Sequence, residues 1–412
     1  MFRRPRAQPA IAFIFITLFL DSFGLGVVVP VLPKMIQQME GGDLDSATLT
    51  VGFLVSLYAL MQFLFSPVLG SLSDHFGRRP IILGSLLGAG IDYMLLAWAP
   101  NMAWIIVGRV ISGITAANFT AASAYIADVT SAEKRAAGYG IIGSAFGLGF
   151  ITGPLVGGWL GEYSFRLPFW FCAGVTLLNW LYGAFVLPES LAPENRRKFV
   201  WVSAHPIKAL AALRRWPLVL GLSVPHFVVN LVHSIYPSLW VLYTGYRYHW
   251  DTLSVSISLS IVGVMSAIVQ AGLAGKILAR IGERAGMCWG LFFMALALAS
   301  YGVAPEGWMI YGLIIIGSFG GIGNPAVQSL ISKAVPPDQQ GAVQGALNSL
   351  SSMASIVGPI IWTALFTWAL DHKSFMTSGL PFIAAGALTV GALGLTLRVF
   401  ALNQPAEMGD AS

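Results

Sequence analysis

The chain contains a series of apolar runs, each about as long as the hydrocarbon core of a bilayer is thick. A helix needs about 20 apolar residues to cross that core, and twelve runs of this kind fit into the 412 residues. Only 10% of the residues are charged, against about 25% in a soluble globular protein. The sequence therefore predicts an all-α membrane protein with twelve transmembrane helices. The predicted spans are residues 10–33, 47–72, 81–99, 102–126, 137–161, 167–187, 217–243, 253–279, 285–304, 307–333, 341–369 and 377–400.

A polar linker divides these spans into two groups of six. The segment 188–216 is rich in Pro, Lys and Arg, whereas the other connections are short. We therefore predict an N-terminal six-helix bundle over residues 1–187, a cytoplasmic linker over 188–216 and a C-terminal six-helix bundle over 217–412. Within the linker, a short amphipathic helix is expected around 204–214.

Lys and Arg are unevenly distributed between the two sets of predicted loops. Eighteen of the 23 lie in one set and four in the other, and Arg109 lies inside a span. Because cytoplasmic loops carry the excess of Lys and Arg, both termini are predicted to be cytoplasmic. The same bias explains the net charge of +5 better than nucleic-acid binding does.

The two groups of six are related by an internal repeat with a constant offset of 205 residues. Parallel repeats of this kind place a central site between two halves that rock against each other. The charges are only partly repeated, because Asp74, Arg109 and Asp128 correspond to Ala279, Ile314 and Lys333. The identical pairs are Gly70 and Gly275, Gly77 and Gly282, Arg79 and Arg284, Gly140 and Gly345, Gly153 and Gly358, and Pro154 and Pro359.

Charged residues inside the first group of spans need an explanation, because a charge at the membrane centre costs about 2.5–3.5 kcal/mol even on insertion scales. Asp92 and Arg109 lie on adjacent spans joined at Pro100 and Asn101, each about 10 Å from the same surface. The two are therefore expected to pair. Two interpretations are open: a static ion pair that fixes helix packing, or a carboxylate that exchanges its arginine for a proton during transport.

Further titratable residues are candidates for proton coupling. Asp21 lies near the middle of span 10–33, either as a permanently protonated carboxyl that bonds a neighbouring helix or as a cavity-lining proton or cation site. His226, Asn230 and His233 have the spacing i, i+4, i+7, which places them on one helical face. Histidine titrates near neutral pH, so His226 and His233 serve either packing or proton coupling. The candidate substrate-binding amides are Gln62, Asn118, Asn230 and Gln270.

The turn Gly70–Pro80, GSLSDHFGRRP, connects the second and third spans. Asp74 can pair with Arg78 across this turn, and Asp128 is a second acid nearby. Such a network can form in one conformation and break in the other, which would make it a gate; the alternative is a solvated loop. In span 137–161, glycines spaced four apart and Pro154 predict a close-packed helix crossing, which would act as a tight, water-excluding pivot between the two halves. The candidate gating residues are Gly70, Asp74, Gly77, Arg78, Arg79, Asp128, Gly153 and Pro154.

These motifs resemble those of the major facilitator superfamily. Gly70–Pro80 is similar to its loop 2–3 signature, and Gly140-x8-Gly149-x3-Gly153-Pro154-x2-Gly157-Gly158 is similar to the motif of its drug/proton antiporter branch. The segments 20–24, 58–62, 92–93 and 126–131 look like those of tetracycline/proton antiporters.

The resemblance implies roles for individual residues. Asp21, Asp92 and Arg109 match positions tied to coupling, and Gln62 and Gln270 match positions tied to substrate binding. The chain also departs from that family, because Ser266 and Met294–Ala295 stand where its best-studied members carry a histidine and an acid.

The sequence thus predicts a secondary transporter of the cytoplasmic (inner) membrane that exports an amphipathic drug in exchange for protons by alternating access, and the resemblance implies a tetracycline-like drug. The alternatives are a uniporter or proton symporter of a small metabolite, and a membrane enzyme or lipid-handling protein. Neither a G-x4-G-K-[ST] phosphate loop nor an H-E-x-x-H zinc motif occurs in the sequence. We expect no cofactor, no metal and no nucleic-acid partner. The expected partners are the drug, protons and the lipid bilayer, and the chain is expected to function as a monomer.

Overall fold

The computed structural model describes residues 7–116, 118–130, 135–199, 213–336, 339–372 and 375–403. Within these ranges the secondary structure is helical, and eleven segments are long and apolar enough to cross a membrane. One of them, Thr252–Val303, has 52 residues and would be about 78 Å long as a straight helix, more than twice the thickness of the hydrocarbon core. Gly282 breaks this segment, with φ 77° and ψ 163°. The break divides it into two spans, so the predicted all-α fold is confirmed and the described residues accommodate twelve spans.

Contacts between Cα atoms divide the chain into two compact units. The first holds the described residues up to 199 together with Thr244–Gly263, and the second holds 213–243 and 264–403. The segment Thr244–Gly263 follows the predicted linker in sequence but packs with the first unit. The amphipathic helix expected around 204–214 falls almost entirely outside the described residues.

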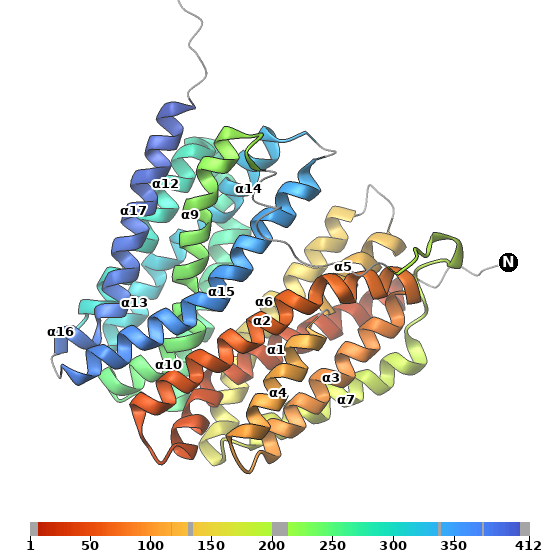
Figure 1. Cartoon of the computed structure of the whole chain (residues 1–412), viewed down its shortest axis with the longest axis horizontal. Helices are drawn as coiled ribbons and strands as arrows, with labels where there is room; N and C mark the ends of the chain where they lie inside the picture. Colours follow the sequence, from red (N-terminus) through yellow and green to blue (C-terminus); the bar gives the residue numbers. More distant parts are fainter. Residues whose placement is uncertain are drawn as a thin grey trace, which may run out of the picture. The chain divides into compact units, whose positions relative to one another are not determined.

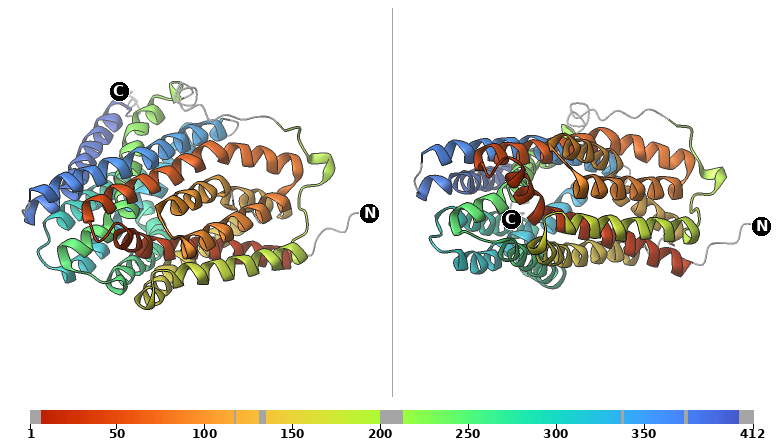
Figure 2. Two further views of the ribbon diagram at one scale, coloured as in Figure 1. Left: turned by 60° about the horizontal axis from the view of Figure 1, so that its bottom comes forward. Right: turned by 90° about the horizontal axis from the view of Figure 1, so that it is seen from below.

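The helices of the first unit run alongside one another, in red to yellow (Figures 1 and 2). Helix α1 packs mainly against α6, α3 against α7, and α2 against α4. These elements are α1 Ala7–Met39, α2 Leu44–Phe76, α3 Arg78–Trp98, α4 Met102–Thr115, α5 Asn118–Val129, α6 Arg135–Tyr163, α7 Leu167–Val186 and the 3-10 turn η2 Pro193–Asn195, with most of α11 Thr252–Ala267.

Glycines of α6 bring its backbone very close to α1. A Cβ atom built on Gly153 would lie 3.0 Å from the Gly26 Cα, and one on Gly157 would lie 2.9 Å from the Val27 Cα. In return, a Cβ on Gly26 would lie 2.7 Å from the Cδ of Pro154. Small residues permit such an approach between membrane helices. The close-packed crossing expected at Gly153 and Pro154 is therefore present, but its partner is α1, so this contact lies within the first unit rather than between the two halves.

In the second unit, α12 packs mainly against α17 and α14, while α9 contacts α17 and α15. The last residues of α10, from Thr244 on, belong to the first unit. The elements of the second unit are α9 Pro217–His233, α10 Ile235–Tyr248, the π-helical turn η3 Ile268–Leu273, α12 Ala274–Val303, α13 Gly307–Ser318, the 3-10 turn η4 Phe319–Ile322, α14 Gly323–Ala334, α15 Gln340–Asp371, α16 Phe375–Ser378 and α17 Leu380–Leu402.

The internal repeat is visible in the backbone. Gly77 and Gly282, which are 205 positions apart, both have positive φ, at 110° and 77°. The fourth span of each half is also interrupted at related positions. Helix α4 ends at Thr115 and α5 begins at Asn118, while η4 separates α13 from α14 around Gly321. Two halves that differ greatly in sequence thus share their irregular features.

Candidate functional site

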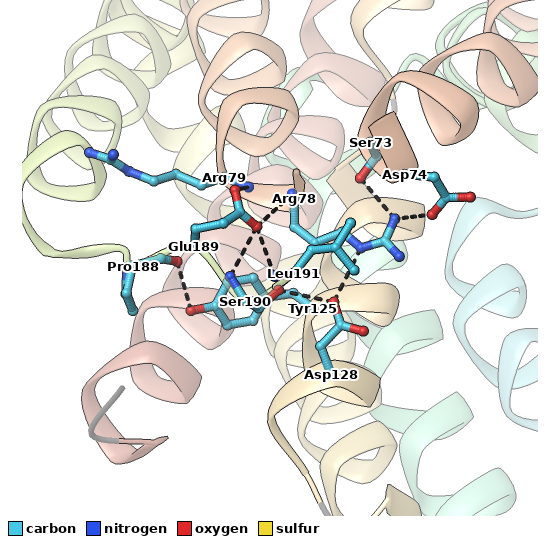
Figure 3. Close-up of polar contacts among 10 residues, drawn as sticks. All are labelled: Ser73, Asp74, Arg78, Arg79, Tyr125, Asp128, Pro188, Glu189, Ser190 and Leu191. Atoms are coloured by element: carbon cyan, nitrogen blue, oxygen red, sulfur yellow. Dashed lines mark hydrogen bonds and ion pairs between the residues drawn. The ribbon is translucent and has the colours of Figure 1, made fainter. Parts of the chain in front are cut away.

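The turn between α2 and α3 gathers the charged residues of the predicted gate (Figure 3). Arg78, the first residue of α3, contacts Asp74 through Nη1 at 2.6 Å and Asp128 of α5 through Nε at 3.2 Å. Its Nη1 also donates a hydrogen bond to the Ser73 hydroxyl at 3.1 Å. The hydroxyl of Ser190 donates to the same oxygen of Asp128 at 3.0 Å. One guanidinium group therefore connects α2, α3 and α5, and the expected pairing of Arg78 with both acids is confirmed.

Glu189, which the sequence analysis did not single out, holds the start of α3 (Figure 3). Its carboxylate accepts hydrogen bonds from the backbone N–H groups of Arg78 at 2.8 Å and Arg79 at 3.2 Å. The first N–H groups of a helix have no partner within the helix, and a carboxylate at this end is stabilising. Glu189 lies just beyond α7, at the start of the predicted linker. No local sequence pattern marks this contact, because the partners of Glu189 are more than a hundred residues away.

The two glycines of the turn, Gly70 and Gly77, differ in their surroundings. Gly77 has φ 110° and ψ 166°, a region that essentially only glycine adopts, and a Cβ there would lie 2.6 Å from the Glu189 Cδ. Gly70, in contrast, has open space around its Cβ position. Arg79 donates from Nη2 to the Ala184 carbonyl at 2.6 Å, near the end of α7. The structure thus explains Gly77 and Arg79 by contacts and gives no packing reason for Gly70.

The second unit has a related arrangement in which the charges are exchanged. Glu283 and Lys333, at the positions that correspond to Arg78 and Asp128, form an ion pair. The Ser329 hydroxyl donates to Glu283 at 3.0 Å. Arg284 corresponds to Arg79 and donates to the carbonyl of Asn403 at 2.8 Å, just beyond α17. The sequence analysis noted that Lys333 replaces Asp128 but did not match Glu283 with Arg78, and so it did not predict this pair.

Asp92 of α3 and Arg109 of α4 form a buried ion pair, which confirms the expected pairing. Asp92 is 1% exposed and Arg109 is 7% exposed, and Nη2 of the arginine donates to Oδ2 of the carboxylate. Gly108 gives the carboxylate room against α4, because a Cβ there would lie 2.6 Å from Oδ1. An ion pair so far from water is strongly destabilised when either partner loses its charge. The pair can therefore convert a change of protonation into a change of helix packing.

Two tyrosines relate Asp21 to this ion pair. Tyr58 of α2 and Tyr93 of α3 each lie within electrostatic range of Asp21, Asp92 and Arg109. Gly24, one turn beyond Asp21, leaves room for the Tyr93 ring, since a Cβ at Gly24 would lie 2.7 Å from its Cζ. The structure therefore brings the predicted coupling residues of the first half into one region of the first unit.

The predicted polar stripe of the second half lies on α9. The His226 Nε2 lies 2.9 Å from the Ser351 hydroxyl of α15, and Asn230 donates to the His226 carbonyl at 2.8 Å. Ser351 was not predicted, and its hydroxyl also donates to the Leu347 carbonyl at 3.1 Å. His233, the last residue of α9, contacts the Tyr236 ring edge-on at 5.9 Å. His226 and Asn230 thus form one cluster, and His233 packs on an aromatic ring two turns away.

The glutamines expected to bind substrate have unused hydrogen-bonding groups. Neither Gln62 of α2 nor Gln270 of η3 makes a side-chain hydrogen bond to any residue that the structure describes. Gln270 is exposed and Gln62 is half-buried. Gly113 of α4 packs against α2 beside Gln62, because its Cβ position is 2.8 Å from the Tyr58 carbonyl oxygen. The side chain of Asn118, the first residue of α5, lies outside the described part of the chain.

No metal centre is visible among the residues described, where no group of three or more His, Cys, Asp or Glu could hold an ion. Both cysteines, Cys172 and Cys288, are free thiols.

Residues 14–359 match the family model of the Major Facilitator Superfamily, which covers most of the chain. The chain belongs to the major facilitator superfamily. It is therefore a multi-pass membrane transporter rather than an enzyme. The turn with Gly77 and Arg78, and the Gly153–Pro154 contact, are thus features of a transporter of this superfamily.

Curated relatives cover nearly the whole transporter. It is 38% identical to the tetracycline resistance protein, class C, of Escherichia coli, over 93% of this chain and 95% of that protein. It is 37% identical to the class G protein of Vibrio anguillarum, over 84% and 88% of the two chains. The class B protein of Escherichia coli is 36% identical, over 85% and 87%.

Solved structures of transporters share the fold. The nucleoside transporter NupG superimposes with a TM-score of 0.76 at 14% identity, covering 95% of this chain and 99% of that one. The human organic anion transporter MFSD10 gives a TM-score of 0.69 at 22% identity, covering 95% and 100%. At these identities the likeness shows the fold alone.

Proposed function

We propose that this transporter is a proton-coupled antiporter that exports a tetracycline-like drug across the inner membrane by alternating access. The observation that carries the proposal is its 38% identity with a tetracycline resistance protein over 93% of the chain. The placement of Lys and Arg supports an orientation with both termini in the cytoplasm. Because one chain holds both six-helix repeats, a monomer suffices for transport.

Proton coupling is assigned to the region of Asp21, Asp92 and Arg109. Protonation of Asp92 would leave the Arg109 guanidinium without a counter-charge in a site where Asp92 is 1% exposed. An unpaired buried charge is strongly unfavourable, so α3 and α4 would shift to give Arg109 another partner. Substrate binding and protonation would then favour different arrangements of the same helices, which is the requirement for exchange.

Substrate recognition is assigned to amides on apolar helices. Gln62 and Gln270 each have unused donor and acceptor groups among the described residues, and an amide of this kind can hydrogen-bond the hydroxyl and carbonyl groups of a drug. Asn230, beside His226, is a further candidate. An amide left without a partner in a membrane span is unfavourable, so these groups favour a polar ligand or water in the substrate pathway.

The gate is assigned to the α2–α3 turn. The ion pairs of Arg78 with Asp74 and Asp128 join three helices at one end of the first unit. Opening the transporter at this end requires those contacts to break and to be replaced by water. Such partly exposed pairs contribute little to stability, so they can break and form in each transport cycle.

The test is substrate-induced proton release from inverted membrane vesicles with an acidified interior. Addition of tetracycline should raise the internal pH, and the double variant Asp21→Asn, Asp92→Asn should show no release. Glu194→Gln, which changes an exposed acid of the linker, is the matched control and should behave as the unmodified protein. Release by other cationic or zwitterionic drugs alone would replace the substrate and keep the mechanism. Transport without proton movement, or with protons moving in the substrate's direction, would overturn antiport.

A further inference from the structure

Two irregular turns meet inside the second unit. The π-helical turn η3, Ile268–Leu273, interrupts one span, and the 3-10 turn η4, Phe319–Ile322, interrupts another. The two turns contact each other. Single π turns are frequent at functional sites, and a 3-10 stretch within a helix often marks a hinge or local strain. Because both spans are irregular where they meet, the contact between η3 and η4 is a candidate part of a functional site.

Two consecutive glycines place η4 between its neighbours. A Cβ on Gly320 would lie 3.3 Å from the Cβ of Met294 on α12. A Cβ on Gly321 would lie 3.3 Å from Cγ, 3.4 Å from Nε2 and 3.6 Å from Cδ of Gln270. Gly290 of α12 packs closely against the residue that follows η4, because a Cβ on Gly290 would lie 2.8 Å from the Gly323 Cα. This packing holds η4 against α12. Gly321 therefore presents bare backbone to the side chain of Gln270.

Gln270 depends on this packing for its orientation. Its amide is exposed and makes no hydrogen bond within the described ranges, so no polar contact selects one rotamer. A freely rotating glutamine would lose conformational entropy when a ligand fixes it. The contact with Gly321 restricts the Gln270 side chain, its amide included, on the side that faces η4.

We infer that Gly321 is a positioning residue for substrate recognition, which holds the amide of Gln270 so that it can hydrogen-bond the transported drug. This inference rests on the proposed function and deepens it. Gly321 itself need not touch the substrate. A methyl group at this position would displace the amide by a few tenths of an ångström and weaken one hydrogen bond to the drug.

The experiment compares Gly321→Ala with Gly312→Ala, a glycine of the same span whose Cβ position faces open space. Drug-driven proton release should show a KM raised roughly 3- to 10-fold in Gly321→Ala, as expected for one weakened hydrogen bond. The maximal rate should stay within about twofold, because the proton-coupling residues are unchanged. Gly312→Ala should match the unmodified protein. A lowered rate at unchanged KM would overturn the inference.

A double-mutant cycle decides whether Gly321 acts through Gln270. In a Gln270→Ala background, Gly321→Ala should have no further effect on KM, since the amide is already absent. Gln270→Asn, with a shorter side chain, should restore part of the affinity lost in Gly321→Ala. Equal effects of Gly321→Ala with and without the glutamine would overturn the inference.

The same variants are tested for tetracycline binding by equilibrium dialysis of the detergent-solubilised protein. This measurement separates the two proposals. If the unmodified protein binds tetracycline without releasing protons, antiport fails, while the binding cycle still tests Gly321. If it releases protons normally and Gly321→Ala binds the drug unchanged, only the inference on Gly321 fails.

Discussion

Glu283 and Lys333 form an ion pair at the positions where the first half pairs Arg78 with Asp128, with the two charges exchanged. Both pairs join the start of one helix to the end of a later one, and each follows a glycine with positive φ. The geometry of the contact is thus retained although neither charge is.

Because the two pairs share their geometry, we expect that the negative charge of Glu283 and the positive charge of Lys333 can be exchanged. Glu283→Lys and Lys333→Glu should each reduce drug-driven proton release several-fold, because they place like charges side by side. The double variant should regain at least half of the activity. Thermal stability should change little, because ion pairs at the surface contribute little to stability. Glu306→Lys, an exposed acid before α13, is the control. A double variant no better than the singles would argue against a role for the pair.

Gly77→Ala and Gly282→Ala separate backbone strain from a side-chain clash. Both glycines adopt backbone angles that cost other residues about 1–3 kcal/mol, so both variants should unfold at lower temperature. Gly77→Ala should be the more damaging, since its Cβ would lie 2.6 Å from the Glu189 Cδ while Gly282 faces open space. The additional loss of melting temperature in Gly77→Ala, relative to Gly282→Ala, should vanish when Glu189 is also changed to Ala. Equal melting temperatures of the two single variants would show that the clash is relieved by movement of Glu189.

The Asp92–Arg109 pair should respond differently to loss of one charge and loss of both. Asp92→Asn should destabilise the protein by about 3–5 kcal/mol, because it leaves a buried guanidinium unpaired. Asp92→Asn combined with Arg109→Gln should recover most of this stability and still show no proton release. Thermal unfolding in detergent and vesicle assays measure the two properties. A double variant that transports normally would make the pair purely structural.

Asp251, between α10 and α11, provides a pH test outside the spans. Hydrogen bonds from Ser254, one of them from its backbone N–H at 2.7 Å, lower the pKa of the Asp251 carboxyl, and nearby Lys34 adds to the effect. A lowered pKa means that the charged form stabilises the folded protein above its ordinary pKa, near 3.9, and that this stabilisation is lost as pH falls through the lowered value.

Asp251→Ala should therefore lower the melting temperature at pH 7, by the equivalent of about 1 kcal/mol for a lost helix cap. The difference from the unmodified protein should shrink towards pH 3. Asp251→Asn, which keeps a capping oxygen without the charge, should show a smaller loss and little dependence on pH. Melting curves in a detergent stable at both pH values measure this. A constant difference between pH 7 and pH 3 would exclude the charge as the cause.

The sequence located the Asp92–Arg109 pair because charges are rare in apolar spans and a tight turn between two helices brings residues to equal depth. It also located Arg78 with its acids, because Asp74 lies one helical turn away. It could not locate Glu189 or Ser351. Both act through tertiary contacts, at sequence separations of 111 and 125 residues, and neither belongs to a local pattern.

The interruptions within the helices could also not be predicted from the sequence. The predicted span 253–279 contains the π turn at Ile268–Leu273, and nothing in its composition marks an extra residue per turn. The glycine-rich stretch around Gly320 was a signal for the 3-10 turn, but glycine equally permits close packing in a regular membrane helix. Only the packing of neighbouring helices decides between these outcomes.

The membership of Thr244–Gly263 in the first unit bears on how the gene can be divided. Ser256 packs on Gly158 of α6, whose Cβ position is 2.6 Å from the Ser256 Cβ, and the Ser260 hydroxyl donates to the Ile151 carbonyl at 3.0 Å. A polypeptide that stops in the linker would lack this covering for α6. If the two halves were expressed as separate polypeptides divided at the linker, the first would therefore need Thr244–Gly263 from the second to complete its packing. The two fragments would have to associate while they fold.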